Sequence, residues 1–311
     1  MNISELQTQV TSILGEMPEN ILRVYFSYWQ SDKYVSYVPQ LSTALQKEIV
    51  NTVLTPLAKK ISDHNLVEYN PVGVADGEVE ELKVSSIPNI ETFKASLLDE
   101  TVFKSMDTLE ISKIDFYCLE ILCDEKNILI FRQFQKLKKL RKGLLTQILN
   151  DELVAMDGDF LGIDDISDIL VYGEDVLLLN HISLERIFKY RDEFLKKTKE
   201  ALGELLTKNI IVNIDKFTED CQRDIRIMKK FTNIMTKDRL PLFFDNFDKV
   251  DGIVKDLDLD IEFEPTNETG VARMIYRDRS QLFHIVNLLS DSYFKSLIAE
   301  RTGLAKIESE V

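Results

Sequence analysis

The 311-residue sequence is poor in glycine, proline and cysteine, with 11, 7 and 3 of them respectively. So little glycine and proline leaves no room for long disordered linkers. The three cysteines, Cys118, Cys123 and Cys221, are too few for a disulfide framework and form no repeated CxxC motif. A zinc site would need clustered cysteine and histidine ligands. We therefore expect three buried, reduced thiols and no metal site.

Long apolar runs are also missing. No stretch approaches the roughly 18 apolar residues of a membrane-spanning helix, and residues 1–5 lack the basic start of a signal peptide. The protein is thus expected to stay in the cytoplasm. The sequence contains no Gly-rich phosphate loop ending in Lys-Ser/Thr, no GxGxxG and no GxSxG nucleophile elbow. From these absences we expect no catalytic residues and no cofactor.

Basic residues are outnumbered, since 38 Lys and Arg stand against 53 Asp and Glu, for a net charge of -15. The two signs are sharply segregated, however. Residues 126–150 include seven basic and no acidic residues, whereas residues 151–175 include nine acidic and no basic ones. A second acidic block, 248–268, has eight acidic residues against Lys249 and Lys255. Because binding depends on local fields, this segregation keeps a nucleic-acid surface possible despite the net charge.

Apolar periodicity predicts an α+β fold with two domains, an N-terminal α/β region at 1–110 and a second domain at 111–311. In the first region, residues 20–29 have the pattern of a strand and residues 40–61 that of a long helix. Pro56 lacks the amide proton that a helix interior needs, so a kink or a restart is expected there.

The second domain opens with two segments that are apolar on both faces, as in central strands, at 114–123 and 128–134. Gly173-Glu174 has the composition of a two-residue turn that needs glycine first. Further short strands are predicted at 152–156, 166–172 and 175–180. Together these segments predict a mostly antiparallel meander sheet with flanking helices.

The C-terminal third is predicted to be mainly helical. Ser183 is placed to cap a helix over about 184–206, and a second helix is expected at about 217–237. A last helical region is expected from Ser280 to about Ile307. Before it, a strand pair is predicted at 259–264 and 271–276.

The strongest local signal for function is a basic run that follows the strand at 128–134. Phosphate binding needs clustered cations, because each neutralised phosphate releases condensed counterions. Leu137 and Leu140 can anchor the run to the core. The alternative is an exposed basic turn that pairs with the acidic block after it. Six of eleven positions are basic: Arg132, Lys136, Lys138, Lys139, Arg141 and Lys142.

The helix predicted at 217–237 supports the same interpretation. Its basic residues recur on the side opposite the apolar face, as expected of a helix that follows a phosphate backbone. Asn233 fills the gap in this stripe, whereas Glu219, Asp220 and Asp224 dilute its charge. An ordinary solvated helix surface is the alternative. The candidate contacts are Arg223, Arg226, Lys230 and Lys237.

A metal-dependent nuclease is the competing hypothesis, because an acidic cluster follows the basic run. Magnesium needs converging carboxylates, but a metal nuclease also needs a base or lysine around the attacking water. The residues around this cluster include no Glu-x-Lys pair of the kind that restriction-type nucleases carry, so a solvated acidic loop is the simpler interpretation. The cluster consists of Asp157, Asp159, Asp164, Asp165 and Asp168.

Three stretches together resemble the KwaB family of Kiwa anti-phage systems. The first joins Ile130–Phe134 to the basic run, the second runs from Ile169 to Tyr190, and the third is Leu288–Leu297. The resemblance covers about residues 112–305 and rests on pattern and order, with no catalytic signature.

This resemblance implies a cytoplasmic effector that binds DNA and works with KwaA, a multi-pass partner that would recruit it to the inner face of the inner membrane. It also implies self-association as a dimer or a larger assembly. No catalytic residues can be carried over. The sequence therefore predicts a DNA-binding defence protein that blocks phage DNA transactions without cutting, with a divergent metal-dependent nuclease as the alternative.

Overall fold

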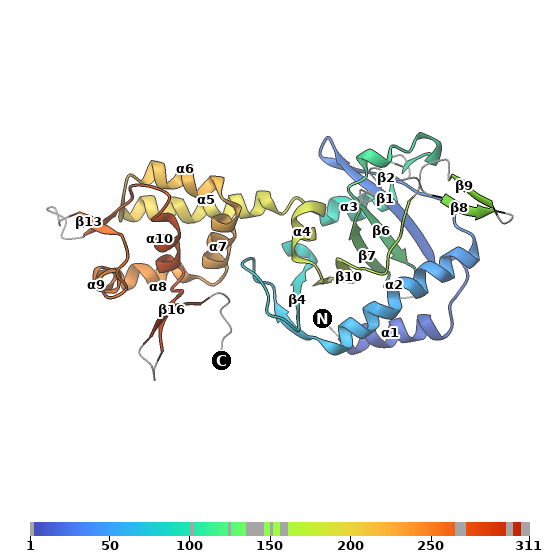
Figure 1. Cartoon of the computed structure of the whole chain (residues 1–311), viewed down its shortest axis with the longest axis horizontal. Helices are drawn as coiled ribbons and strands as arrows, with labels where there is room; N and C mark the ends of the chain where they lie inside the picture. The colour runs from blue at the N-terminus through green and yellow to red at the C-terminus, as the bar shows by residue number, and fades with distance from the viewer. Residues whose placement is uncertain are drawn as a thin grey trace. The chain divides into compact units, whose positions relative to one another are not determined.

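The computed structural model of the chain describes residues 3–99, 103–123, 126–134, 146–149, 152–155, 161–264, 272–296 and 301–305. The chain forms two compact units (Figure 1). Unit 1 comprises Met1–Tyr69 and Asp76–Tyr190, and unit 2 comprises Asn70–Ala75 and Arg191–Val311. The domain boundary predicted at 110/111 falls inside unit 1, because β1 (Leu22–Gln30) pairs with β6 (Phe116–Ile121) in one sheet.

Unit 1 is built on a mixed sheet. Among the described residues the sheet has nine strands, in the order β3-β4-β11-β10-β7-β6-β1-β2-β5. All neighbouring pairs are antiparallel except β3–β4 and β2–β5. The remaining strands are β2 (Lys33–Tyr37), β3 (Asn65–Glu68), β4 (Glu78–Lys83), β5 (Phe103–Lys104), β7 (Ile128–Gln133), β10 (Ile169–Tyr172) and β11 (Asp175–Leu178). A separate antiparallel pair joins β8 (Thr146–Leu149) to β9 (Glu152–Ala155).

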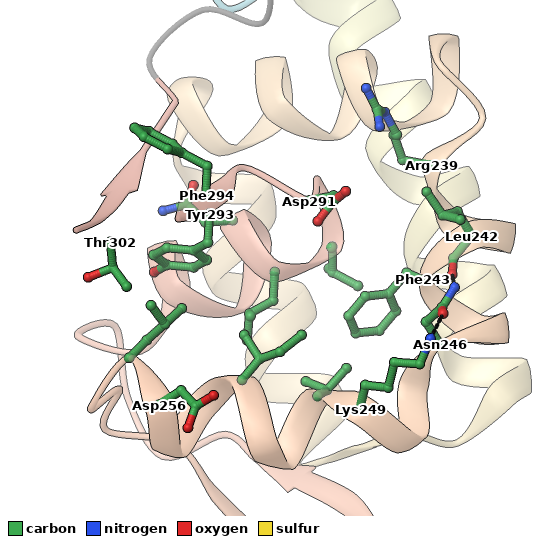
Figure 2. A pocket seen from close by; sticks show the side chains of 16 residues that line it. Arg239, Leu242, Phe243, Asn246, Lys249, Asp256, Asp291, Tyr293, Phe294 and Thr302 are labelled. Carbon is green, nitrogen blue, oxygen red and sulfur yellow. Dashed lines mark hydrogen bonds between the residues drawn. The ribbon is translucent and has the colours of Figure 1, made fainter. Parts of the chain in front are cut away.

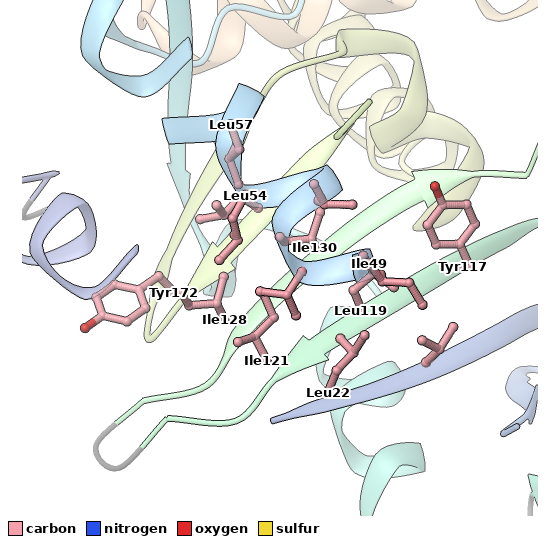
Figure 3. Close-up of a cluster of buried hydrophobic side chains, with 14 of the residues drawn as sticks. Leu22, Ile49, Leu54, Leu57, Tyr117, Leu119, Ile121, Ile128, Ile130 and Tyr172 are labelled. Carbon is pink, nitrogen blue, oxygen red and sulfur yellow. The ribbon is translucent and has the colours of Figure 1, made fainter. Parts of the chain in front are cut away.

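The central strands are apolar on both faces because the sheet is covered on both sides. One face of β6 and β7, with Leu119 and Ile130, packs on α1 (Ile3–Gly15) and α2 (Thr43–Asp63) in a cluster shown in Figure 3. The opposite face carries Phe116 and Phe131, whose rings contact Phe93 of α3 (Ile90–Leu98) at 5.5 and 5.1 Å. The alternation of strand side chains between two covered faces explains the continuous apolar runs.

The structure confirms the predicted turn at Gly173 and excludes a restart of the helix at Pro56. Gly173 has φ +61° and lies in a two-residue turn, since Tyr172 pairs with Asp175 across the hairpin. Helix α2, however, runs through Pro56 without a restart, since the helix is assigned from Thr43 to Asp63. Its apolar stripe is buried on both sides of the proline, and this tertiary packing holds the helix together.

The helix predicted at 184–206 is in fact two helices, and its predicted cap is wrong. Asn180 caps α4 (His181–Ile187) by accepting from the backbone N–H of Ile182, whereas Ser183 is buried inside α4. Lys189 has φ +55°, outside the helical region, so the chain breaks there before α5 (Arg191–Lys208) begins. This break coincides with the end of unit 1.

Unit 2 is mainly helical, as predicted, around a core that includes Phe217, Phe231 and Tyr276. The predicted strand pair is present as β13 (Glu262–Glu264) and β14 (Arg273–Ile275), with β12 (Ile211–Val212) beside β14. The last helix, α10 (Leu282–Leu289), ends far before the predicted Ile307, because Asp291 turns with φ +51° into the hairpin of β15 (Tyr293–Lys295) and β16 (Thr302–Leu304). The other helices are α6 (Ile214–Arg223), α7 (Ile225–Thr236), α8 (Arg239–Asp245) and α9 (Val250–Asp256). The predicted α+β class is thus confirmed.

Candidate nucleic-acid interface

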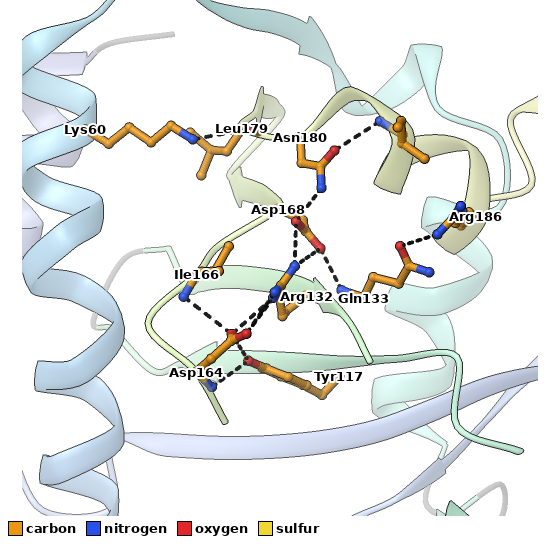
Figure 4. Close-up of polar contacts among 11 residues, drawn as sticks. Lys60, Tyr117, Arg132, Gln133, Asp164, Ile166, Asp168, Leu179, Asn180 and Arg186 are labelled. Carbon is orange, nitrogen blue, oxygen red and sulfur yellow. Dashed lines mark hydrogen bonds and ion pairs between the residues drawn. The ribbon is translucent and has the colours of Figure 1, made fainter. Parts of the chain in front are cut away.

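Arg132, the first cation of the basic run, lies next to the end of β7 with its side chain only 5% exposed. Its Nε and Nη2 atoms donate to the carboxylate of Asp164 at 2.8 to 3.2 Å. Its Nη1 atom donates to Oδ1 of Asp168 at 3.1 Å. Figure 4 shows the guanidinium between the two carboxylates. One arginine therefore joins two separate residues of the acidic cluster.

Asp168 is fully buried and is satisfied by more than this ion pair. Its Oδ2 accepts from the backbone N–H of Gln133 at 2.7 Å, and its Oδ1 accepts from the side-chain amide of Asn180 at 2.9 Å. Its backbone carbonyl accepts from the N–H groups of Leu179 and Asn180. Such a closed network ties the end of β7 to the start of β10 and to the first turn of α4.

The network also shifts the ionisation of its members. Partial burial opposes the charge of Asp164, but the hydrogen bonds and the positive charge of Arg132, with the hydroxyl of Tyr117, outweigh it and lower the pKa of Asp164. The hydrogen bond to Asp164 in turn raises the pKa of Arg132. Arg132 is thus an internal counter-ion, and this corrects the expectation that its guanidinium faces solvent and phosphate.

The other members of the basic run, Lys136, Lys138, Lys139, Arg141 and Lys142, lie outside the described residues, as do Asp157 and Asp159. The structure nevertheless defines both ends of the segment that carries them. Arg132 precedes the segment, and Asp164 and Asp168 follow it, so their ion pairs hold its two ends together.

The structure describes three of the five aspartates of the acidic cluster, namely Asp164, Asp165 and Asp168. Asp164 and Asp168 both use their carboxylates on Arg132. In the part of the chain that the structure describes, no group of three or more histidine, cysteine, aspartate or glutamate residues is arranged to hold a metal ion.

The second candidate surface is not one helix, as predicted, but two. Asp224 has an extended backbone, with φ -109° and ψ 113°, and separates α6 from α7. Its Oδ1 accepts from the backbone N–H of Arg226 at 3.0 Å and so caps α7. The hydrogen bond from the Arg226 side chain, aided by the charges of Arg226 and Arg279, lowers the pKa of Asp224. The predicted stripe is therefore interrupted where its first two cations lie.

Three exposed arginines gather at this α6–α7 junction. The Arg226 side chain is 71% exposed, donates to Asp224 at 2.9 Å and lies 5.0 Å from the ring centroid of Phe283. Arg279 is 54% exposed and reaches the same carboxylate at 3.3 Å. Arg223 is 63% exposed and pairs with Glu219. We call Arg223, Arg226 and Arg279 the junction arginines.

Sequence reasoning missed Arg279, because it follows β14, far from α7 in the chain. A signal was present in Arg277-Asp278-Arg279, two cations in a turn before a helix. The remaining predicted cations differ from the junction arginines. Lys230 donates to Oδ1 of Asn287 at 2.8 Å, and the backbone N–H of Lys237 closes α7 by donating to Asn233 at 2.9 Å. Asn233 is 8% exposed, so it does not extend an exposed stripe.

The described helices include none that is both long and apolar enough to cross a membrane. No curated protein and no solved structure matches the chain. The model of the family described as Kiwa protein KwaB-like matches residues 111–299. The match begins at the position where the sequence predicted a second domain, and it spans more than half of the 311 residues. The chain therefore belongs to the KwaB-like family of Kiwa anti-phage defence systems.

Proposed function

We propose that this member of the Kiwa defence family is a non-catalytic effector that binds DNA through its phosphates and blocks phage DNA transactions. The observation that carries the proposal is the group of junction arginines, whose side chains are all more than half exposed. Two of them, Arg226 and Arg279, share one carboxylate, Asp224, which is itself only 8% exposed.

Arginine is suited to this task, because its planar guanidinium can give two parallel hydrogen bonds to one phosphate. The carboxylate of Asp224 already holds the side chains of Arg226 and Arg279 through ion pairs. These side chains therefore lose less conformational freedom on DNA binding than unpaired arginines would. The three arginines outnumber by one the two carboxylates with which they pair, Asp224 and Glu219. Binding depends on such local arrangements of charge and not on the net charge of -15.

The basic run is the second proposed contact. The phosphate contacts of this run would be Lys136, Lys138, Lys139, Arg141 and Lys142. Lys230 and Lys237 would extend the contact along α7. Arg132 would act differently, by holding the base of the segment through Asp164 and Asp168. The acidic residues between 151 and 175 would then limit indiscriminate binding along the protein surface.

We further propose that the chain acts with the membrane subunit KwaA and associates with itself. The apolar faces of α1 and α2 are buried in the unit 1 core, so neither of these helices offers a bulky apolar stripe to lipid. Purified protein should therefore stay in the supernatant with anionic liposomes and co-sediment with membranes that contain KwaA. Direct sedimentation with lipid alone would contradict this, and a monomer at micromolar concentration would contradict self-association.

A plasmid incubated with the protein, with and without Mg²⁺ or Mn²⁺, separates this proposal from the nuclease alternative. Retarded but intact plasmid under all conditions is the expected result. Cleavage that depends on a metal and is lost with chelator would contradict the proposal and support the nuclease alternative.

A further inference from the structure

Unit 2 contains a cavity of about 730 Å³, and the residues that line it do not include the junction arginines. Its walls come from α8, α9, the end of α10 and the β15–β16 hairpin. The floor is part of the core of the unit and includes Phe243, Val250, Leu288 and Leu289, none more than 8% exposed. This volume lies within the range of sites for small molecules, about 300–1,000 Å³.

One end of the cavity is aromatic and carries acceptors. Phe294 is 52% exposed, and its ring lies so close to Gly303 that a Cβ atom there would come within 2.6 Å of it. Glycine at this position therefore lets the ring rest on the β16 backbone. The neighbouring Tyr293 is oriented by a 2.8 Å hydrogen bond between its hydroxyl and Nδ1 of His284. Figure 2 shows Asp256 and Thr302 at the same end.

The other end is cationic. Lys249 and Arg239 line it, with Asn246 and Leu242 between them in Figure 2. The Lys249 ammonium donates to the neutral amide oxygen of Asn246 at 2.6 Å, and the Asn246 amide in turn donates to the carbonyl of Leu242 at 2.9 Å. A neutral partner orients Lys249, so its charge is not taken up by an ion pair and this end can receive an anion, although Asp291 also lines the cavity.

We propose that this cavity binds a nucleotide, with the base against Phe294 and Tyr293 and the phosphate at Lys249 and Arg239. Bases stack on aromatic side chains, and an exocyclic amino group can donate to a carboxylate such as that of Asp256. An acyl chain with an acidic head would use the floor and the cations but would leave Asp256 without a donor. The arrangement thus fits the polarity of a nucleotide, whose planar base carries donors at one end and whose phosphate is anionic at the other.

Calorimetric titration of the full-length protein with dAMP, adenosine and inorganic phosphate tests the proposal. We expect dAMP to bind at least tenfold more tightly than adenosine or phosphate. Phe294→Leu should weaken dAMP and adenosine alike by about tenfold, as the loss of one base stack predicts. Lys249→Gln should weaken dAMP about tenfold and leave adenosine unchanged.

Two matched controls lie in the same unit but outside the cavity. Leu206→Ala removes a 58% exposed apolar side chain from α5, and Lys255→Gln removes a 71% exposed lysine from α9. Neither should change binding. No binding of dAMP at millimolar concentration, or binding that ignores both cavity variants, overturns the proposal.

The nucleotide could be free or could be the end of a DNA strand, and a 5′-phosphorylated oligonucleotide separates the two sources. If Phe294→Leu weakens dAMP but not the oligonucleotide, the cavity takes free nucleotides. If it weakens both, the cavity also takes strand ends. Each result supports a nucleotide site. The proposal does not depend on the DNA interface, because the junction arginines are unchanged in every variant.

Discussion

Arg132 and Arg226 were predicted to do the same thing, yet their surroundings are opposite. The Arg132 side chain is 5% exposed and binds two carboxylates, one of them fully buried. The Arg226 side chain is 71% exposed and shares one carboxylate, Asp224, with Arg279. Arg132 therefore belongs to the internal structure of unit 1, whereas Arg226 belongs to the surface of unit 2.

This difference shows that a run of cations in a sequence does not reveal which of them are buried and which are exposed. Arg132 is part of β7, a strand covered on both faces, so its side chain must be neutralised inside the fold. Arg226 is in the first turn of α7, where the apolar face is buried and the opposite face meets solvent. The secondary structure that carries a cation thus decides whether its side chain is buried among carboxylates or open to solvent.

The largest expected effect comes from removing the buried cation. Arg132→Met should lower the free energy of unfolding by about 3–5 kcal/mol, because it leaves Asp168 buried without its counter-ion. Urea denaturation measures this. The matched Arg226→Met should leave the free energy of unfolding nearly unchanged. Equal effects of the two substitutions would remove the distinction between them.

Charge reversal in the basic run should have the next largest effect, on DNA affinity and not on stability. Replacing Lys138, Lys139, Arg141 and Lys142 with glutamate should weaken DNA binding at least about 100-fold and abolish defence, because four attractive charges become repulsive. Gel shift and phage plating measure the two outcomes.

The control for that reversal must change the same net charge. Reversing Lys33, Lys47, Lys59 and Lys199, all of them exposed, does so and should leave binding within a few fold. Reversing Glu78, Glu80 and Glu81 is a poor control, because Glu80 is 1% exposed and bonded to His181 at 2.9 Å. Normal binding by the folded basic-run variant would leave the junction arginines as the interface.

Neutralising the junction arginines should have a smaller effect. A triple variant, Arg223→Gln, Arg226→Gln and Arg279→Gln, should bind DNA about tenfold more weakly at physiological salt. The slope of log affinity against log salt should become shallower by about 0.9 for each of up to three lost phosphate contacts. The matched control replaces Lys196, Lys197 and Lys199 of α5, two of which pair with Glu193 and Glu200. If the α5 variant loses as much affinity, the effect is one of net charge.

The smallest effect concerns pH. The pKa of Asp164 is lowered in the folded protein, so its ion pair stabilises the fold above the ordinary pKa of about 3.9. That stability is lost as the pH falls through the lowered value. Asp164→Asn should be less stable than the parent at pH 6, and the gap should narrow towards pH 2 in denaturation curves. A constant gap would contradict this linkage.

The sequence predicted what depends on local pattern. The both-face apolar runs gave β6 and β7, and Gly173 gave the turn between β10 and β11, because each depends on neighbouring residues alone. The prediction from sequence failed where the local structure depends on contacts with residues that are distant in the chain. Asp224 breaks a helix that its periodicity would continue, and Arg279 reaches α7 from a remote turn. Arg132 contacts Asp164 and Asp168, which lie 32 and 36 residues later in the chain.

The central claim, DNA binding through phosphates, is tested most directly by measuring affinity for one duplex over a range of salt concentrations. Each neutralised phosphate contributes a slope of about -0.9 in log affinity against log salt. The junction arginines alone predict a slope of about -3, and contacts from the basic run would make it steeper. An affinity that stays constant between low and physiological salt would contradict the account.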